Sequence, residues 1–376
     1  MRVVKVYFLV ADLNLCGGGE RVALNLASCL KRYYDYDTGV LSIQKLRWPL
    51  PFDAPDGVTL NSLDMHLEST NVFHKAWSRF IAVRRASRWL MSRHADVVLG
   101  IGTFPNIVLS LVSRKRTARI GCEHIWLNAP TRPWRVIRRL LYPRLNAVVM
   151  LTEEDKARAK NLNPALFCIP NSCPIDDPRI ADPNNNRVLA IGRIEHQKGF
   201  DRLISAFQII SKSYPKWNLV LVGEGKEEPN LRNMVSELSL RDRVIIKPNK
   251  KDVISEYLQS SIFALSSRYE GLPMVLIEAQ SLGLPVVAFD CQTGPKEIVI
   301  DGETGFLVEQ NNVELFAQRL SELMSNSELR QQMGVRAKTE SQRFSNRYIC
   351  NKWRSLFSEL GLISTVHGSE KKCGST

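Results

Sequence analysis

The sequence predicts an α/β fold of two domains, each built on a doubly wound parallel sheet. Three observations lead to this prediction. Short apolar runs alternate with helix-like segments, a glycine-rich loop follows the first apolar run, and a stretch rich in Pro, Asn and Asp divides the chain near its middle. Alternating strand and helix signals are typical of parallel sheets whose helices cover both faces. At 376 residues the chain is long enough for two cores.

The composition is that of a globular protein, with 44% hydrophobic and 24% charged residues. We find no apolar run of the about 18 residues that a membrane span needs. The first residues could be mistaken for a signal peptide, but Lys5 splits their apolar part and they lead into a glycine turn, so we interpret them as a strand. The eight cysteines are scattered without a C-x-x-C pair, which disfavours a zinc site or a disulfide framework and indicates a cytoplasmic protein.

The formal net charge of +13 requires an acidic partner, which could be nucleic acid, anionic lipid or a phosphorylated substrate. The excess lies in the first half, where residues 73–93 contain no acid. A nucleic-acid-binding protein is one alternative, although aromatic residues do not interleave with the basic clusters and no helix-turn-helix or RNP-like pattern is present.

In the first half, residues 4–10 are expected to form a strand, followed by the turn GGGER and a helix. The glycines of this turn, Gly17 to Gly19, are expected to permit a close backbone approach and positive φ. Residues 39–64 indicate strands joined by a Pro-rich loop, and 96–102 and 118–122 indicate buried strands. The last of these places Glu123 and His124 at its carboxyl end, where parallel sheets bind ligands.

Two basic segments in this half are predicted to be helices. In residues 72–93 the apolar face is expected to hold Phe73, Ala76, Trp77, Phe80 and Met91, with cations that include Arg84, Arg85 and Arg88 on other sides. In residues 133–142 an arc of Trp134, Val136, Ile137, Leu140 and Leu141 opposes Arg135, Arg138 and Arg139. An apolar face opposite an arginine face is the pattern of a helix lying in an anionic membrane surface. The alternative is a solvated helix packed on the core.

In the second half, two strand ends carry the candidate ligand-binding residues. Arg193 and Lys198 follow the strand near 188–192, and Arg and Lys side chains suit a diphosphate. The strand 262–265 is followed by Glu270, Gly271 and Leu272 and by a helix from Met274 that carries Glu278. A helix N-terminus suits an anion such as a diphosphate. Glu270 and Glu278, on either side of this N-terminus, could contact the groups on either side of the diphosphate in a nucleotide sugar. The alternative is that one is an ordinary surface glutamate and the other an ordinary glutamate on a helix face.

Five motifs in order resemble family 4 retaining glycosyltransferases of the GT-B fold, over about residues 4 to 345. They are GGGER (17–21), GRIEHQKGFDRLI (192–204), VGEG (222–225), EGLPMVLIE (270–278) and GLPVVAFD (283–290). The chain looks most similar to the bacterial branch that adds hexosamines to polyprenyl-diphosphate-linked glycans. The resemblance implies two Rossmann-like domains facing across a cleft and a C-terminal helix crossing back to the first domain.

The resemblance also implies a reaction: a hexose or N-acetylhexosamine moves from a UDP-sugar to a polyprenyl-diphosphate-linked glycan, in surface polysaccharide assembly on the inner face of the cytoplasmic membrane. Neither a metal nor a cofactor is expected. Glu270 would orient the donor sugar and Glu278 would hold the ribose. The donor diphosphate would contact Arg193, Lys198, Gly271, Leu272, Gly17 and Gly18. His124 would lie near the reacting centre or the acceptor diphosphate, and a basic helix in the region of 72–93 would contact the acceptor's phosphates. A soluble or different lipid acceptor, or a GT-B scaffold without catalytic activity, are alternatives.

These signals give the predicted domain boundaries. Residues 1–170 form an acceptor-binding domain, 171–186 a linker that could act as a hinge, and 187–344 a nucleotide-sugar-binding domain. Residues 345–362 form the returning helix, and 363–376 are expected to be a disordered tail.

Overall fold

A computed structural model of the protein describes residues 3–15, 17–50, 54–66, 72–112, 117–124, 130–248 and 252–363, with side chains except those of 72–76. Two compact units form: residues 1–121, 140–147 and 350–376 in one, and residues 122–139 and 148–349 in the other. The predicted domain boundaries remain a prediction. The expected disordered tail lies outside the described residues apart from residue 363.

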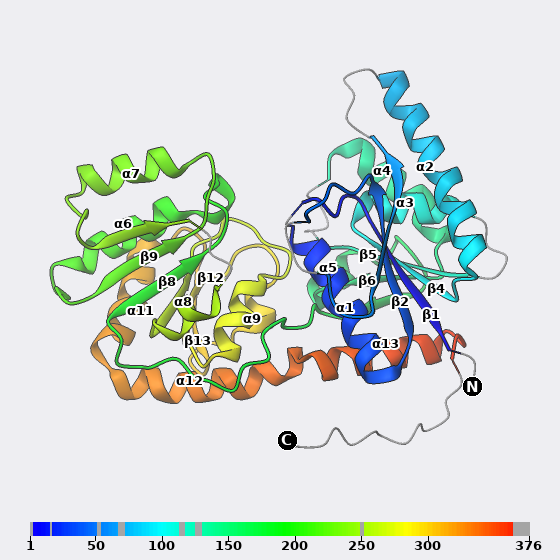
Figure 1. Ribbon diagram of the computed structural model, residues 1–376. Helices are drawn as coiled ribbons and strands as arrows, with labels where there is room; N and C mark the ends of the chain where they lie inside the picture. The colour runs from blue at the N-terminus through cyan, green and yellow to red at the C-terminus, as the bar shows by residue number, and fades with distance from the viewer. Residues whose placement is uncertain are drawn as a thin grey trace. The chain divides into compact units, whose positions relative to one another are not determined.

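The first sheet has the strand order β3-β2-β1-β4-β5-β6-β7. Figure 1 labels β1, β2, β4, β5 and β6 of this sheet. Its strands are β1 (Lys5–Val10), β2 (Asp37–Gln44), β3 (Thr59–Met65), β4 (Val97–Ile101), β5 (Ala118–Cys122), β6 (Ala147–Met150) and β7 (Leu166–Cys168). β1 pairs in parallel with both β2 and β4. The neighbours on either side of β1 are therefore β2, the next strand in the sequence, and β4, which comes after β3; this is the doubly wound topology that the sequence predicts.

The helices that accompany the first sheet are α1 (Gly18–Tyr34), α2 (Val72–Arg93), α3 (Thr103–Leu111), α4 (Arg132–Leu141), the 3-10 turn η1 (Tyr142–Arg144) and α5 (Glu153–Arg158). The expectation of positive φ in the glycine turn is wrong: φ is −82° at Gly17, and none of Gly17, Gly18 and Gly19 has a positive φ. Because α1 already begins at Gly18, two of the three glycines take ordinary helical angles.

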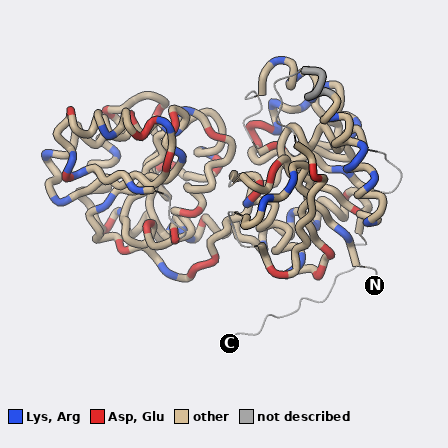
Figure 2. The backbone as a smooth tube through the Cα atoms, turned by 45° about the horizontal axis from the view of Figure 1, so that its top comes forward, with Lys and Arg blue, Asp and Glu red and all other residues tan. Residues whose placement is uncertain are grey.

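The second sheet has the order β10-β9-β8-β11-β12-β13. Its strands are β8 (Arg187–Ile191), β9 (Asn218–Val222), β10 (Val244–Lys247), β11 (Ile262–Leu265), β12 (Val286–Phe289) and β13 (Gly305–Val308). The accompanying helices are the 3-10 turn η2 (His196–Lys198), α6 (Phe200–Ser211), α7 (Glu228–Glu237), α8 (Ile254–Leu258), α9 (Met274–Ser281), α10 (Pro295–Ile298), α11 (Val313–Ser325) and α12 (Ser327–Ser341). Figure 2 shows basic and acidic positions mixed over this part of the chain.

Both faces of the second sheet are buried. Along β8, Val188 and Ala190 belong to the core beneath α6, α7 and α11, whereas Leu189 and Ile191 belong to the core beneath α8 and α9. Successive side chains of a strand point to opposite faces, so a strand covered on both faces appears in the sequence as a continuous apolar run. This is why the short runs of the second half could be recognised as strands.

The C-terminal helix α13 (Asn346–Glu359) follows the 3-10 turn η3 (Gln342–Phe344). From Cys350 onward it belongs to the same compact unit as α1. The hydroxyl of Tyr34 on α1 donates to the side-chain carbonyl of Asn351, and the Arg354 guanidinium lies 5.2 Å from the Tyr34 ring centroid. The predicted helix that returns to the first domain is confirmed.

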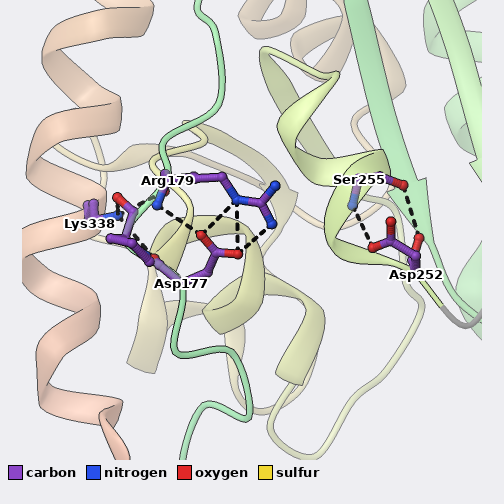
Figure 3. Close-up of polar contacts among 6 residues, drawn as sticks. Asp177, Arg179, Asp252, Ser255 and Lys338 are labelled. Atoms are coloured by element: carbon purple, nitrogen blue, oxygen red, sulfur yellow. Dashed lines mark hydrogen bonds and ion pairs between the residues drawn. The ribbon is translucent and has the colours of Figure 1, made fainter. Parts of the chain in front are cut away.

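The predicted linker is fastened to α12 over part of its length (Figure 3). The Lys338 ammonium donates to the backbone carbonyls of Asp177, Pro178 and Arg179 at 3.5, 2.9 and 2.9 Å. Arg179 in turn donates to the Asp177 carboxylate, and these hydrogen bonds lower the pKa of Asp177 to about 2. Residues 177–179 are therefore held to the second-sheet helices and are not a free connection.

Candidate active site

The loop after β11 is attached firmly to the turn between β8 and α6. The Ser266 hydroxyl donates to the Lys198 carbonyl at 2.9 Å, and the Arg268 amide donates to the Gln197 carbonyl at 2.7 Å. Gly199 lies against the Ser266 carbonyl with φ of 62°, and a Cβ there would collide with that oxygen. The close approach of these two loops at the carboxyl edge of the sheet requires a glycine.

Arg268 adds an ion pair to this connection. Its guanidinium makes two hydrogen bonds to the Asp201 carboxylate, at 3.0 and 2.6 Å. Burial would raise the pKa of Asp201, but the hydrogen bonds and charge of Arg268 outweigh it and lower that pKa. The loop after β11, which carries Glu270, is therefore attached to the turn between β8 and α6 at two places: at residues 197–198 and at Asp201.

Glu270 and Lys198 are in direct contact within this braced region. The Lys198 ammonium donates to Oε1 of Glu270 at 2.7 Å, and the Ser267 hydroxyl donates to the same oxygen at 2.6 Å. Glu270 is only 7% exposed and Ser267 is 1% exposed. A buried carboxylate needs such partners to remain charged. Because both donors take Oε1, the orientation of the carboxylate is fixed and Oε2 is turned to a different side.

The backbone beside Glu270 is held by the residues after β12. The Thr293 hydroxyl donates to the Glu270 carbonyl at 2.9 Å, and the Glu270 amide donates to the Gln292 carbonyl. Gly294 has φ of 102°, and a Cβ there would lie 2.5 Å from the Gly271 carbonyl oxygen. This packing positions Gly271 and Leu272 immediately before α9, whose N-cap residue is Pro273.

Glu278 lies one turn inside α9, as the spacing predicts, and is held by a different element. The hydroxyl of Tyr257, on α8, donates to Oε2 of Glu278 at 2.8 Å. Tyr257 is completely buried and its ring packs 5.7 Å from that of Phe263 on β11. The two glutamates therefore have separate supports, Ser267 and Lys198 for one and Tyr257 for the other.

Arg193 and Lys198 lie on the same turn but make different contacts. Arg193 donates to Oε1 of Glu195 at 3.1 Å, and its side chain is 68% exposed. Lys198 is largely buried beside Glu270. The structure thus brings Lys198 to Glu270, and it leaves the guanidinium of Arg193 at the surface.

His124 follows β5 with both ring nitrogens buried and without a hydrogen-bond partner among the described residues. Burial lowers its pKa to about 4, so the imidazole is neutral near pH 7. Its neighbour Glu123 is 2% exposed and forms an ion pair with Arg138, with 3.4 Å between Oε2 and Nη1. The residues that follow His124 (125–129) lie outside the described ranges.

A family model described as "Glycosyl transferases group 1" matches residues 175–340, which include β8 to α12 and both glutamates. The chain is 31% identical over 366 residues to the amylovoran biosynthesis glycosyltransferase AmsD of Erwinia amylovora, covering 94% of this chain and 99% of that protein. This chain belongs to the group 1 glycosyltransferases. The family is the retaining family 4, and its fold is GT-B.

Two further matches place the glycosyltransferase among known proteins. It is 27% identical over 369 residues to a Campylobacter jejuni enzyme named "GalNAc-alpha-(1->4)-GalNAc-alpha-(1->3)-diNAcBac-PP-undecaprenol alpha-1,4-N-acetyl-D-galactosaminyltransferase", covering 95% of this chain and 99% of that one. The crystal structure of Anabaena HepE with UDP-glucose matches with a TM-score of 0.80 at 18% identity, covering 94% of this chain and 99% of HepE. At that identity the likeness to HepE supports the fold alone.

The membrane prediction for α4 of this glycosyltransferase is wrong in one respect. Arg138 was expected on an exposed arginine face, but it is 2% exposed and paired with Glu123. Val136 and Leu140, predicted on the apolar face, are 58% and 68% exposed, as side chains of a face turned towards a membrane would also be. Arg139 is exposed, and Arg135 and Trp134 are half-buried. The buried acid Glu123 explains the difference, because it draws the middle arginine inward.

Helix α2 of the glycosyltransferase exposes a mixed stripe. Trp77, Phe80 and Met91 are 62%, 50% and 66% exposed, and Arg84 and Arg88 are exposed beside them. Arg85 instead donates to the carbonyls of Leu63 and Asp64 at the end of β3. The predicted apolar positions Phe73 and Ala76 lie outside the described side chains.

At the glycine turn of the first sheet, the two glycines Gly17 and Gly18 differ in the space beside them. A Cβ at Gly18 would have no atom of the described residues within 4 Å, whereas a Cβ at Gly17 would collide with the Glu20 carboxylate, so the open part of the turn is at Gly18. Sequence reasoning missed Tyr257, Ser267 and Thr293. The Ser-Ser pair directly after β11 was a possible signal for Ser267, since small hydroxyl residues at strand ends often bind neighbouring groups. Tyr257 had no signal, because a lone Tyr in a short helix is usual core packing.

Proposed function

We propose that this glycosyltransferase moves a hexose or N-acetylhexosamine from a UDP-sugar to a polyprenyl-diphosphate-linked glycan during bacterial surface polysaccharide assembly. The observation that carries the proposal is the contact of Lys198 with Glu270 directly before the N-terminus of α9. A fixed carboxylate, an ammonium group and a helix N-terminus converge there, as a sugar attached to a diphosphate requires. The names of the Erwinia and Campylobacter relatives support the biological setting.

The geometry gives each group a role in the reaction. Cleavage of the sugar–phosphate bond develops negative charge on the leaving diphosphate, and the helix N-terminus after Pro273 and the ammonium of Lys198 stabilise that charge. Glu270 accepts a hydrogen bond from a donor-sugar hydroxyl through Oε2, while Ser267 keeps Oε1 fixed. Arg193 exchanges its exposed contact with Glu195 for the diphosphate, since a surface ion pair contributes little and is easily replaced. His124, as a neutral imidazole, lies near the reacting centre.

The acceptor and the membrane are part of the same proposal. None of the helices within the described residues is long and apolar enough to cross a membrane. The exposed stripe of α2 combines Trp77 and Phe80, whose ring centroids are 5.8 Å apart, with Arg84 and Arg88 and with no acid in the helix. That chemistry suits the interface of an anionic bilayer and the phosphates of a lipid-linked acceptor. On α4, the exposed Arg139 and the half-buried Arg135 offer further positive charge for such an interface.

The test of the reaction is UDP release, measured across a panel of UDP-sugars with a prenyl-diphosphate-linked N-acetylhexosamine acceptor and with soluble sugars. Release that depends on the prenyl-diphosphate acceptor is expected. The Arg193→Ala variant should have a raised KM for the UDP-sugar, while Arg336→Ala, at an exposed arginine on α12, serves as the control. Turnover with soluble sugars only would reject the lipid-linked acceptor, and no UDP release with any donor would favour a scaffold without catalytic activity.

Membrane contact is tested by sedimentation with vesicles that contain phosphatidylglycerol. Neutralising Arg84 and Arg88, or Arg135 and Arg139, should shift the protein from vesicles to solution, and added salt should do the same. The matched control neutralises Arg319 and Arg336 on α11 and α12. Equal sedimentation of all variants would reject the membrane surface.

A further inference from the structure

A second candidate site lies on the first sheet, where Asn14 joins two loops. Asn14 follows β1, and its side chain amide donates to the Lys45 carbonyl at 2.9 Å after the end of β2. The side-chain carbonyl oxygen of Asn14 accepts a hydrogen bond from the Arg47 backbone amide at 2.7 Å. Asp12 fixes this side chain in turn, because its carboxylate accepts from the Asn14 side chain at 2.6 Å and from the Asn14 amide at 2.9 Å. We refer to these four residues as the Asn14 clasp.

Large apolar side chains flank the Asn14 clasp on both loops. Leu15 is 58% exposed. Trp48 is 69% exposed, more than any other large hydrophobic residue in the described part of the chain. Lys45 and Arg47 are exposed between them. The four hydrogen bonds of the Asn14 clasp hold this loop in place, and an exposed indole gains free energy when a ligand covers it and removes it from water.

The position of the Asn14 clasp favours a ligand. Ligands of doubly wound sheets bind outside the carboxyl ends of the strands, and β1 and β2 are adjacent strands that both end at the clasp. The turn that carries Gly17 and Gly18 follows Leu15 within three residues, and it has open space at Gly18. The flat indole, the apolar Leu15 and the nearby donors of Lys45 and Arg47 form a mixed surface at this edge.

We propose that Trp48, held by the Asn14 clasp, is a stacking platform for a sugar ring of the acceptor glycan. The inference rests on the proposed function, in which the acceptor is a glycan. The face of a pyranose that carries C–H groups matches the electron-rich face of an indole, and the hydroxyls at its rim would accept hydrogen bonds from Lys45 and Arg47. A bilayer is a less suitable partner, because membrane-surface segments bury a continuous helical face and not two side chains on separate loops.

The experiment compares initial rates of Trp48→Ala, Trp48→Phe and wild type with a prenyl-diphosphate-linked N-acetylhexosamine acceptor. We expect Trp48→Ala to raise the acceptor KM about tenfold, a loss of the size found for aromatic contacts of this kind. The KM for the UDP-sugar and the acceptor-independent release of UDP should not change. Trp48→Phe should recover most of the loss. Asn14→Ala should raise the acceptor KM to a smaller extent, because it frees the loop without removing the indole.

Controls separate this inference from its alternatives. Tyr348→Ala removes an exposed aromatic side chain of α13 and should leave both KM values unchanged. An unchanged acceptor KM in Trp48→Ala would overturn the inference. A lower vesicle sedimentation of Trp48→Ala together with wild-type KM for a short-chain acceptor would also overturn it, in favour of a bilayer contact.

Calorimetric binding of the acceptor distinguishes failure of the two proposals. If wild type transfers no sugar but binds the acceptor about tenfold more tightly than Trp48→Ala does, the proposed reaction fails while the sugar platform stands. If wild type transfers sugar and both proteins bind the acceptor equally, the platform fails while the reaction stands. Absence of acceptor binding in wild type would overturn both.

Discussion

The carboxyl edges of the two sheets are built in different ways. At the second sheet the candidate carboxylates are held by other side chains: the buried Glu270 by Ser267 and Lys198, and the half-buried Glu278 by Tyr257. At the first sheet the loops after β1 and β2 are joined by Asn14, but the side chains they present, Leu15 and Trp48, point to solvent. The edge of the second sheet is organised for polar groups of fixed geometry, and the edge of the first sheet offers apolar area and the exposed cations Lys45 and Arg47.

This difference matches what each edge is proposed to bind. A nucleotide diphosphate is a constant group, so donors that are already oriented can stabilise charge on it without reorganisation. The distal sugars of a growing glycan vary. Stacking of a sugar ring on an aromatic face depends less on where its hydroxyls lie than binding through a hydrogen-bond network does. Four experiments test how far the comparison holds.

The largest effect is expected from Glu270→Gln, which retains the shape of the side chain and removes its charge. We expect turnover to fall about 100-fold or more, the size seen when one preorganised polar group of an active site is lost. The melting temperature should stay near that of wild type, because Ser267 can still donate to the amide oxygen. Wild-type turnover in this variant would mean that the supported edge is not the catalytic one.

A second test uses the neutral imidazole of His124. Its pKa in the folded protein is about 4 against about 6.5 in the unfolded chain, so the unfolded state binds more protons between these values. The contribution to stability is fully present above pH 6.5 and is lost as the pH falls through 4, by about 3 kcal/mol in total.

His124→Gln should remove that part of the pH dependence. Urea unfolding at several pH values measures it, with His94→Gln, a substitution at an exposed histidine, as the control. If the free energy of unfolding changed with pH in the same way in wild type and in His124→Gln, the imidazole would be hydrated. The carboxyl edge of the first sheet would then be more open than described.

The third test concerns the backbone beside Glu270. Gly294→Ala must place a Cβ 2.5 Å from the Gly271 carbonyl at a φ of 102°, so we expect a loss of about 2 kcal/mol in the free energy of unfolding together with reduced turnover. Gly302→Ala is a matched control, since its φ is 76° but no atom lies within 4 Å of the added Cβ. Equal losses in both variants would assign the effect to backbone strain alone.

The smallest effect is expected from Tyr257→Phe, which removes the hydrogen bond to Glu278. Affinity for UDP should fall about tenfold, the typical value of a hydrogen bond to a charged group. Affinity for 2′,3′-dideoxy-UDP should not change, because that ligand lacks the hydroxyls that Glu278 would hold. Tyr214→Phe, which removes a hydroxyl bonded to Ser321, is the control. An equal fall for both ligands would show that Tyr257 supports packing and not ribose binding.

Much of the fold could be predicted because its physical signals are local. The strands of the second sheet are buried on both faces and therefore form continuous apolar runs. Pro273, the residue directly before α9, marks where that helix begins. The short strand β7 and the helix α3 were not predicted. β7 has only three residues, all half-buried, so it lacks a distinct apolar signal. In α3 the apolar residues extend over most of the helix, which removes the periodicity that identifies an amphipathic helix.

The site was predictable where motifs carried it and not where tertiary contacts did. Glu270 lies just before a helix N-terminus, Glu278 lies one turn inside the same helix, and Lys198 lies in the loop after a strand, positions that a sequence reveals. The burial of Arg138 depends on Glu123, 15 residues earlier, and no helical projection contains that partner. The support of Glu278 by Tyr257 likewise joins two helices whose approach only the folded chain determines.

Lys338 has a consequence for how freely this chain can change. Its ammonium binds three carbonyl oxygens of the segment 177–179, and every amino acid, proline included, supplies a carbonyl. Substitution at any of those three positions leaves the acceptor atoms in place, so the segment can tolerate wide chemical variety. Lys338 is the donor in all three hydrogen bonds, so its replacement by a residue without a donor would remove all three at once.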